Sequence, residues 1–278
     1  MTARTVWLAS YPKSGNTWVR ALLTALLLEE GELDINRLGH GPIASARWQL
    51  EHYTGLISSD LTASETAALR PLADTAMNAQ LIDSHYRKIH DSLFSGADGG
   101  PIVPVEATLG AVYIVRDPRD VAVSFAHHAD RDVQWVVERM CDAGMTFEHS
   151  LKRIGGQVHQ HLGGWSHHVR SWTEHELFPV TVVRYEDLHA DPAAQLKRVA
   201  AVGELEATQQ KIAASVEATR FERLRAQEQQ DGFRERAGVE RRFFRRGEAG
   251  SWQEELPSEL AGQLVEHHGR TMRRLGYH

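Results

Sequence analysis

The chain has 278 residues, a net charge of −6 and one cysteine, Cys141. A single cysteine excludes an intrachain disulfide, and together with the lack of a secretory signal it predicts a cytoplasmic protein. No apolar run reaches the ~20 residues that a membrane span requires, so no membrane partner is expected. The length fits one α/β enzyme domain over residues 1–278, and the negative charge argues against a nucleic-acid partner.

Apolar runs alternate along the chain in the order typical of a parallel α/β sheet. Strands are expected at residues 5–9, 80–84, 111–115 and 180–184. Helices are expected at residues 17–29, 64–74, 120–128, 151–162, 166–176, 192–202, 208–214 and 258–275, and residues 31–62 and 129–164 are interpreted as insertions. Because short turns join strands to helices, the pattern predicts a three-layer α/β sandwich with a central parallel sheet.

The first motif, Tyr11-Pro-Lys-Ser-Gly-Asn-Thr-Trp18, lies between the first predicted strand and the first predicted helix. Free N–H groups and the helix dipole attract an anion at such a helix N-terminus, and Lys13 adds a full charge. A Walker A loop ends in Gly-Lys-Ser/Thr, whereas Lys13 precedes Gly15 here. The motif therefore predicts a P-loop-like phosphate site that lacks the magnesium-binding hydroxyl.

A second phosphate-binding segment follows the strand predicted at 111–115, in Arg116-Asp-Pro-Arg-Asp-Val-Ala-Val-Ser124. Pro118 suits the first turn of a helix, with Asp117 as its N-cap. Arg116 at the end of the strand and Ser124 about two turns into the helix can hold one phosphate between them. Ligands of open α/β sheets bind beyond the carboxyl ends of the strands, where both motifs fall.

The third motif, Phe243-Phe-Arg-Arg-Gly-Glu-Ala-Gly-Ser-Trp252, lies near the C-terminus. Two arginines followed by two glycines suit a loop that closes over a phosphate with bidentate contacts. Residues 220–246 contain nine arginines and five acidic residues, a local excess of four positive charges. We interpret this excess as a basic patch that attracts a polyanion, with a solvated surface of ion pairs as the alternative.

Together the three motifs resemble those of the PAPS-dependent sulfotransferases, in particular the soluble, cytosolic-type branch. That family has a Tyr-Pro-Lys-Ser-Gly-Thr-Thr-Trp loop for the 5′-phosphosulfate, an Arg…Ser pair for the 3′-phosphate and a C-terminal Arg-Lys-Gly-x-x-Gly-x-Trp loop. This chain has Asn16 in place of the first Thr of that loop, and Arg246 in place of the Lys of the C-terminal loop. The resemblance implies a sulfotransferase with PAPS as co-substrate and adenosine 3′,5′-bisphosphate (PAP) as product.

The resemblance also implies the residues that contact this co-substrate. Trp18, Tyr185 and Thr219 would lie on the adenine side, although Trp18 can also be interpreted as a core residue. The full set of expected binding residues is Lys13, Ser14, Gly15, Asn16, Thr17, Trp18, Arg116, Ser124, Tyr185, Thr219, Phe244, Arg245, Arg246 and Gly247.

His85, after the strand predicted at 80–84, is the candidate catalytic base. The resembled family has Lys-Thr-His at this point, and its histidine deprotonates the acceptor hydroxyl; here Asp83 replaces the lysine. Imidazole titrates close to neutral pH, which suits the role. Lys13 would stabilise the charge that develops on the departing phosphate. The alternative for His85 is a polar histidine that hydrogen-bonds a loop carbonyl, and the base would then lie at Asp83 or His90.

Two other functions stay open: a P-loop kinase-like phosphotransferase, disfavoured by the missing Gly-Lys-Ser/Thr, and a non-catalytic module that binds adenosine bisphosphate. The sixteen histidines do not show the spacings of a zinc site, so no metal is expected. The expected partner is a small molecule with a hydroxyl, or less favourably an amine. Its pocket is expected to be built from residues 39–56, 85–93, 127–146 and 225–242. The family's dimer segment is not found after Trp252, which leaves the oligomeric state open.

Overall fold

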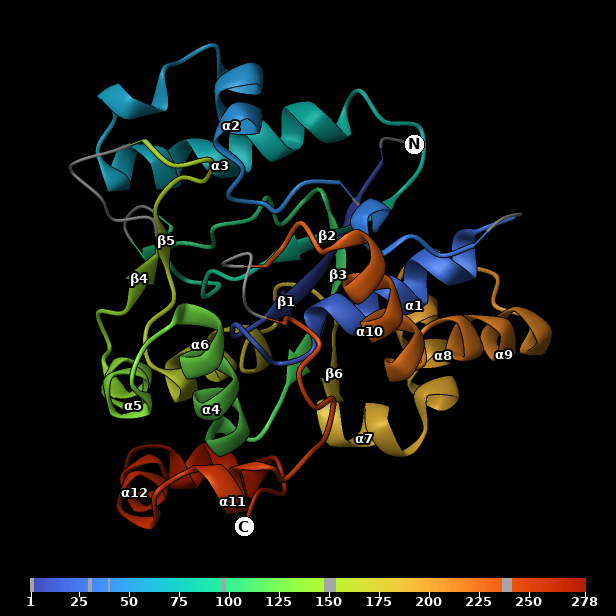
Figure 1. Ribbon diagram of the computed structural model, residues 1–278. Helices are drawn as coiled ribbons and strands as arrows, with labels where there is room; N and C mark the ends of the chain where they lie inside the picture. The colour runs from blue at the N-terminus through green and yellow to red at the C-terminus, as the bar shows by residue number, and fades with distance from the viewer. Residues whose placement is uncertain (1–2, 30–31, 40, 97–98, 148–153, 237–241) are drawn as a thin grey trace.

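A four-stranded parallel sheet forms the centre of the computed structural model, which describes residues 3–29, 32–39, 41–96, 99–147, 154–236 and 242–278 (Figure 1). The strand order is β2-β1-β3-β6. These strands are β1 (Thr5–Ser10), β2 (His85–Ile89), β3 (Thr108–Val115) and β6 (Val180–Arg184). A separate antiparallel pair joins β4 (Thr146–Phe147) to β5 (Gln160–His161).

Helices cover both faces of the sheet, so the predicted three-layer α/β sandwich is confirmed (Figure 1). None of the described helices is long and apolar enough to cross a membrane. In chain order they are α1 (Asn16–Leu27), α2 (Arg47–Thr54), α3 (Ala63–Asn78), α4 (Pro118–Ala129), α5 (Val133–Cys141), α6 (Trp165–Thr173), α7 (Tyr185–Ala190), α8 (Pro192–Val202), α9 (Gln209–Ala218), α10 (Phe221–Asp231), α11 (Trp252–Glu255) and α12 (Ser258–Arg274), with short 3₁₀ turns at Ile35–Arg37 and Ser58–Asp60.

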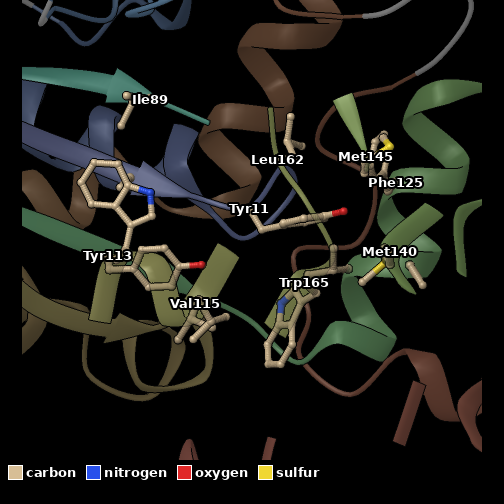
Figure 2. Packing of buried hydrophobic residues seen from close by; sticks show 14 of the residues in the cluster. Tyr11, Ile89, Tyr113, Val115, Phe125, Met140, Met145, Leu162 and Trp165 are labelled. Atoms are coloured by element: carbon tan, nitrogen blue, oxygen red, sulfur yellow. The ribbon is translucent and has the colours of Figure 1, made fainter. Parts of the chain in front are cut away.

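Strand β1 shows how the two faces are filled. Trp7 and Ala9 pack with residues of α4, α5, α6 and α12, a cluster that Figure 2 shows around Tyr113 and Trp165. Val6 and Leu8 point to the other face and pack with residues of α1, α8 and α9. Because both faces are buried, the strand is apolar without interruption from Val6 to Ala9, which is typical of a parallel sheet.

Three strands and seven helices lie close to their predicted positions, and β6 and α8 match theirs in both bounds. The strand predicted at residues 80–84 is wrong, because β2 begins only at His85. Its sequence His-Tyr-Arg-Lys-Ile carries two cations, which a buried strand tolerates only when they are paired. Arg87 is paired here: it forms a buried ion pair with Asp74 of α3 and donates to Oε1 of Gln49 at 2.8 Å.

The helix predicted at residues 151–162 is also wrong from residue 154 onward; residues 151–153 lie outside the described part of the chain. Residues 154–159 contain no helix, and β5 begins at Gln160. Gly155 and Gly156 explain the difference, since glycine destabilises a helix interior by about 1 kcal/mol relative to alanine. The segments interpreted as insertions contain α2 and α5.

Candidate functional site

A cavity of about 840 Å³ lies at the carboxyl ends of the four parallel strands. All three predicted phosphate-binding motifs line it. Of the fourteen expected binding residues only Ser14, whose side chain is fully buried, is missing from the lining. The others that line the cavity are Lys13, Gly15, Asn16, Thr17, Trp18, Arg116, Ser124, Tyr185, Thr219, Phe244, Arg245, Arg246 and Gly247.

The N-terminal loop (residues 11–18) obtains its shape from its own backbone. Lys13 and Gly15 both adopt positive φ, 69° and 106°. A side chain at Gly15 would place its Cβ 2.7 Å from Cδ2 of Tyr185, so only glycine fits there. Asn16 donates to the carbonyl O of Leu8 at 2.9 Å, which ties the start of α1 to β1. The loop is thus preorganised by residues within it and in the strand before it.

Lys13 carries the main electrostatic feature of this loop. Its Nζ lies 4.0 Å from the centroid of the Phe243 ring. Burial, together with the nearby charges of Lys88 and Arg116, lowers the pKa of Lys13 to about 7. A buried cation surrounded by other cations is stabilised by an anionic ligand, so this position favours a phosphate or sulfate group.

Arg116 and Ser124 extend the cationic surface from β3 into α4. The Arg116 guanidinium stacks 4.3 Å from the centroid of the Tyr185 ring, and its Nη2 donates to the carbonyl O of Glu248 at 2.7 Å. Its Nε is buried and has no hydrogen-bond partner among the described residues. Asp117 caps α4 as predicted, accepting from the N–H of Arg119 at 2.9 Å.

One end of the C-terminal loop (residues 243–252) is held by a carboxylate of α10. Glu228 is 3% exposed, and its two oxygens accept from the backbone N–H groups of Phe243 at 2.6 Å and Phe244 at 2.9 Å. Hydrogen bonds to a charged acceptor are about twice as strong as neutral ones. Glu228 therefore fixes where the loop begins.

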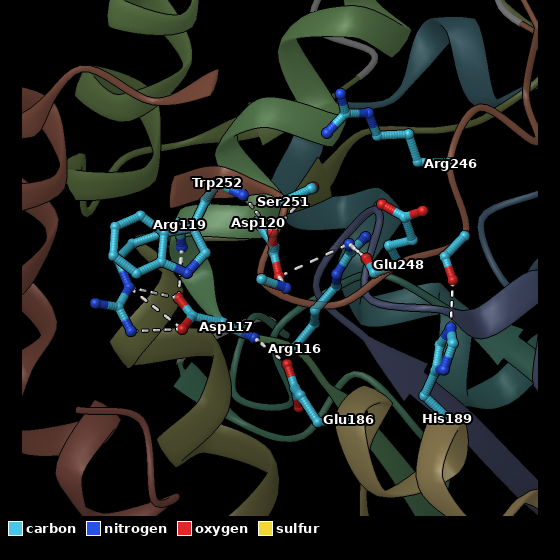
Figure 3. A network of polar contacts seen from close by, with 12 residues as sticks. Arg116, Asp117, Arg119, Asp120, Glu186, His189, Arg246, Glu248, Ser251 and Trp252 are labelled. Carbon is cyan, nitrogen blue, oxygen red and sulfur yellow. Dashed lines mark hydrogen bonds and ion pairs between the residues drawn. The ribbon is translucent and has the colours of Figure 1, made fainter. Parts of the chain in front are cut away.

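The other end of the C-terminal loop is held by Asp120 of α4 (Figure 3). This carboxylate is 1% exposed and accepts from the N–H of Gly250 at 2.7 Å, the N–H of Trp252 at 2.9 Å and Oγ of Ser251 at 3.2 Å. Arg116 lies 3.9 Å from the same carboxylate. Asp120 thus joins the second motif to the third.

The arginines of the C-terminal loop are paired with acidic residues of α11. Arg245 forms a bidentate pair with Glu255, at 2.6 and 2.9 Å. Arg246 lies 3.0 Å from Glu254 and 3.3 Å from Glu255. Both arginines nevertheless line the cavity, so an incoming phosphate would compete with these two carboxylates for them.

The expected adenine-side residues come together at the cavity. Trp18 and Tyr185 pack edge to face with ring centroids 5.9 Å apart. Nε1 of Trp18 is buried without a partner among the described residues, which leaves a donor available to a ligand. Thr219 is 1% exposed and donates its hydroxyl to the carbonyl O of Ser215 at 2.8 Å, so contact with a ligand would fall to its other atoms.

His90, directly after β2, also lines the cavity. Its Nδ1 lies 2.8 Å from the carbonyl O of Ser10, so the ring proton sits on Nδ1 and Nε2 keeps a lone pair. Burial and the charge of Lys88 lower the pKa of His90 to about 3. In the free protein the side chain is therefore a neutral imidazole whose lone pair is on Nε2.

Lys88 lies two residues before His90 and is held by Glu235. Nζ of Lys88 lies 3.0 Å from Oε2 of Glu235, and Nη1 of Arg20 lies 2.6 Å from Oε1. Burial opposes ionisation of this carboxyl, but Lys88 and Arg20 outweigh it and lower the pKa of Glu235 to about 2. The cavity wall thus holds one ionised carboxylate between two cations.

The family model for the sulfotransferase domain matches residues 3–276. The chain belongs to the sulfotransferase family. The family indicated by the three motifs is thereby confirmed.

Among curated relatives, cytosolic sulfotransferase 12 of Arabidopsis thaliana is 26% identical over 276 residues, covering 92% of this chain and 74% of the relative. The amine sulfotransferase of Oryctolagus cuniculus is 25% identical over 159 residues, so that alignment spans 53% of this chain and about half (49%) of the relative.

Two solved structures share the fold. Mouse sulfotransferase SULT7A1 complexed with PAP has a TM-score of 0.61 at 20% identity and covers 97% of this chain and 85% of its own. Retinol dehydratase in complex with androsterone and PAP has a TM-score of 0.63 at 20% identity, and the match covers 98% of this chain and 82% of the retinol dehydratase chain.

In this sulfotransferase, His85 does not lie where the sequence placed it. It is the first residue of β2, pairs with Thr5 at the amino end of the sheet, and its Nε2 lies 3.5 Å from Oγ1 of Thr5. His90 comes five positions after His85, directly after β2, which is a distance of about 16 Å along an extended chain. His85 is absent from the cavity lining, so its predicted position beside the phosphate loop is wrong. The cause is the misplaced strand: β2 begins where it was expected to end.

Lys88 and His90 line the cavity where His85 was expected: sequence reasoning missed Lys88 and offered His90, with Asp83, only as an alternative base. They have the Lys-x-His spacing of the sulfotransferase pattern, which had been matched to Asp83-Ser84-His85 with an aspartate in place of the lysine. The signal was therefore present five residues later, in Lys88-Ile89-His90. Alignment on the lysine, instead of on the expected strand end, would have found it.

The acceptor segments expected from the sequence contribute in part. Three of those segments contribute residues to the cavity lining: Ile43 from 39–56, His128 from 127–146, and Arg234 and Glu235 from 225–242. Two aromatic side chains of these segments do not line the cavity: Trp48 is 59% exposed, and Tyr86 is buried on the face of the sheet that packs against α1, α8 and α9. Phe147, the residue directly after the segment 127–146, does line the cavity.

Proposed function

We propose that this sulfotransferase transfers a sulfuryl group from PAPS to a hydroxyl, or less favourably an amine, of a small molecule and releases PAP. The observation that carries the proposal is the convergence of three cationic segments and the neutral imidazole of His90 on a single cavity. The mouse sulfotransferase and retinol dehydratase structures both contain PAP, which supports the same nucleotide here.

The described residues fit this nucleotide. Lys13 and the backbone N–H groups at the start of α1 would hold the 5′-phosphosulfate. Arg116, Ser124 and Arg245 would hold the 3′-phosphate. Nε1 of Trp18 and Nε of Arg116 belong to residues that line the cavity, and both are buried donors without a partner among the described residues. Unpaired buried donors in a cavity are explained by a ligand that supplies acceptors.

The reaction then divides between two side chains. Nε2 of His90 takes the proton of the acceptor hydroxyl as its oxygen bonds to sulfur. The bond from sulfur to the bridging phosphate oxygen breaks, and negative charge develops on that oxygen. Lys13 stabilises this charge. The role of base, expected at His85 from the sequence, is thus proposed for His90.

Substitution of the two histidines tests the assignment. We expect His90→Ala to lower single-turnover rates by about a hundredfold or more, while PAP affinity stays within about threefold. His85→Ala is the matched control, since it removes an imidazole from the same strand at the opposite end, and its rate should stay near that of the unmodified enzyme. A slow His85→Ala enzyme together with a normal His90→Ala enzyme would refute the assignment.

Nucleotide selectivity tests the proposed 3′-phosphate site. PAP should bind at least ~100-fold more tightly than AMP, or about 2.7 kcal/mol, which two charge-assisted contacts can supply. Arg116→Ala should remove most of this difference in calorimetry. Equal affinities of the unmodified protein for the two nucleotides would contradict the proposal. Tight PAP binding without turnover of any acceptor would instead favour a non-catalytic binding module.

A further inference from the structure

Two glutamines line the cavity on the wall formed by β5 and the chain before it, Gln157 and Gln160. Oε1 of Gln157 accepts from Oγ of Ser45 at 2.8 Å and from Nε2 of Gln160 at 3.0 Å. The amide nitrogen of Gln160 is therefore already used within the protein. Its oxygen, Oε1, is the atom left to face another partner.

That oxygen is in an unusual position. Gln160 is only 2% exposed, and its Oε1 is buried with no hydrogen-bond partner among the described residues. A buried carbonyl that loses water without gaining a donor destabilises the folded protein. Because Gln160 lines a cavity that must admit an acceptor molecule, a donor from that molecule can complete the hydrogen bond.

Gln160 lies close to the chain that carries the proposed base. The backbone N–H of Ser92, two residues after His90, donates to the carbonyl O of His161, the neighbour of Gln160, at 2.9 Å. The same cavity is lined by Phe125 and Phe147, whose rings pack edge to face 5.8 Å apart. Flat apolar walls of this kind suit an aromatic ring.

We infer that Gln160 forms a second recognition point for the acceptor, which is a dihydroxylated aromatic compound. One hydroxyl reacts at His90, and the other donates to Oε1 of Gln160. This inference rests on the proposed sulfuryl transfer and adds the class of acceptor. A site built to hydrogen-bond a hydroxyl discriminates strongly against a compound that lacks it, because the buried acceptor is then left unpaired.

The test compares phenol with catechol, resorcinol and hydroquinone as acceptors for PAPS. At least one diol should have a kcat/KM about tenfold or more above that of phenol. Gln160→Leu should bring this ratio close to one. Gln160→Met, unbranched and of similar length, serves as the second variant if the first does not fold. Gln210→Leu, at an exposed position of α9, is the matched control and should keep the ratio of the unmodified enzyme.

Calorimetry with the same four compounds and the PAP-saturated protein gives a readout independent of turnover. If PAP binds and phenol is sulfated as well as every diol, an ordered water satisfies Gln160; the inference is then overturned and the proposed function stands. Failure to bind or turn over any of the four compounds also overturns it. Absence of PAP binding would instead refute the proposed function itself.

Discussion

The N-terminal and C-terminal loops of the cavity both present cations, but they are held in place differently. The N-terminal loop is fixed by neighbours in sequence: positive φ at Lys13 and Gly15 and the hydrogen bond from Asn16 to Leu8. The C-terminal loop is fixed by two carboxylates from distant helices, Glu228 and Asp120. One loop is therefore preorganised locally, and the other depends on the completed tertiary structure.

The two loops also differ in the state of their charges. Burial and neighbouring cations lower the pKa of Lys13 to about 7, so its charge is destabilised until an anion arrives. Arg245 and Arg246 are already paired with Glu255 and Glu254. A polyanion should consequently gain more from the N-terminal loop, because binding there breaks no ion pair.

Lys13→Ala should have the largest effect of any single change in either loop. We expect the single-turnover rate to fall by about a thousandfold and PAP affinity to fall as well, since Lys13 acts on the phosphate in both ground and transition states. Arg246→Ala is the matched control in the C-terminal loop, and it should lower the single-turnover rate and the PAP affinity by about tenfold or less. Equal losses in the two variants would contradict the proposed difference between the loops.

The same difference explains what the sequence could predict. The N-terminal loop was found because a strand, a glycine turn and a helix follow one another within a few residues, and each has its own local signal. The arginines of the third motif were also visible. The carboxylates that hold this loop, Glu228 and Asp120, could not be predicted. They contact the loop only in the folded chain, and no local sequence pattern marks a carboxylate that accepts a hydrogen bond from a distant backbone N–H.

Strand β2 shows the same limit at the position of the proposed base. Its two cations made the segment look unlike a buried strand. Arg87 can be buried only because it pairs with Asp74 of α3, and the local sequence does not show that pairing. Because the strand was predicted five residues too early, His85 was chosen as the candidate base in preference to His90. The Lys-x-His spacing of Lys88 and His90 was nevertheless present in the sequence. The prediction of the layers depends on many apolar residues, so one misplaced strand does not change it. The prediction of a single catalytic residue depends on the exact position of that strand.

Asp120→Asn should loosen the C-terminal loop without touching the N-terminal one. An amide oxygen accepts more weakly than a carboxylate, and the amide nitrogen repels the N–H groups of Gly250 and Trp252. We expect PAP affinity to fall about thirtyfold, together with faster hydrogen exchange in residues 243–252. Asp83→Asn, exposed before β2, is the control. Unchanged exchange in the loop would show that Asp120 does not hold it.

The pH dependence of PAP binding isolates Lys13. Below pH 7 the free protein already carries the charge, so affinity should change little with the protonation of Lys13. Above pH 7 binding must take up a proton, and affinity should fall by up to about tenfold per pH unit until the raised pKa of the bound lysine is passed. Calorimetry from pH 7 to 9 measures this slope. Lys13→Arg should flatten it, because arginine stays charged throughout.

Glu255→Gln should have the smallest effect and the opposite sign. Glu255 makes both short contacts with Arg245, so it competes with a phosphate for the same guanidinium. Both side chains are more than a quarter exposed, and a pair screened in this way is worth little, so PAP should bind only about threefold more tightly. Glu259→Gln, exposed in the first turn of α12, is the control and should leave the affinity unchanged. A weaker affinity in Glu255→Gln would mean that the carboxylate positions Arg245 for the ligand instead of competing for it, and the C-terminal loop would then be preorganised as fully as the N-terminal one.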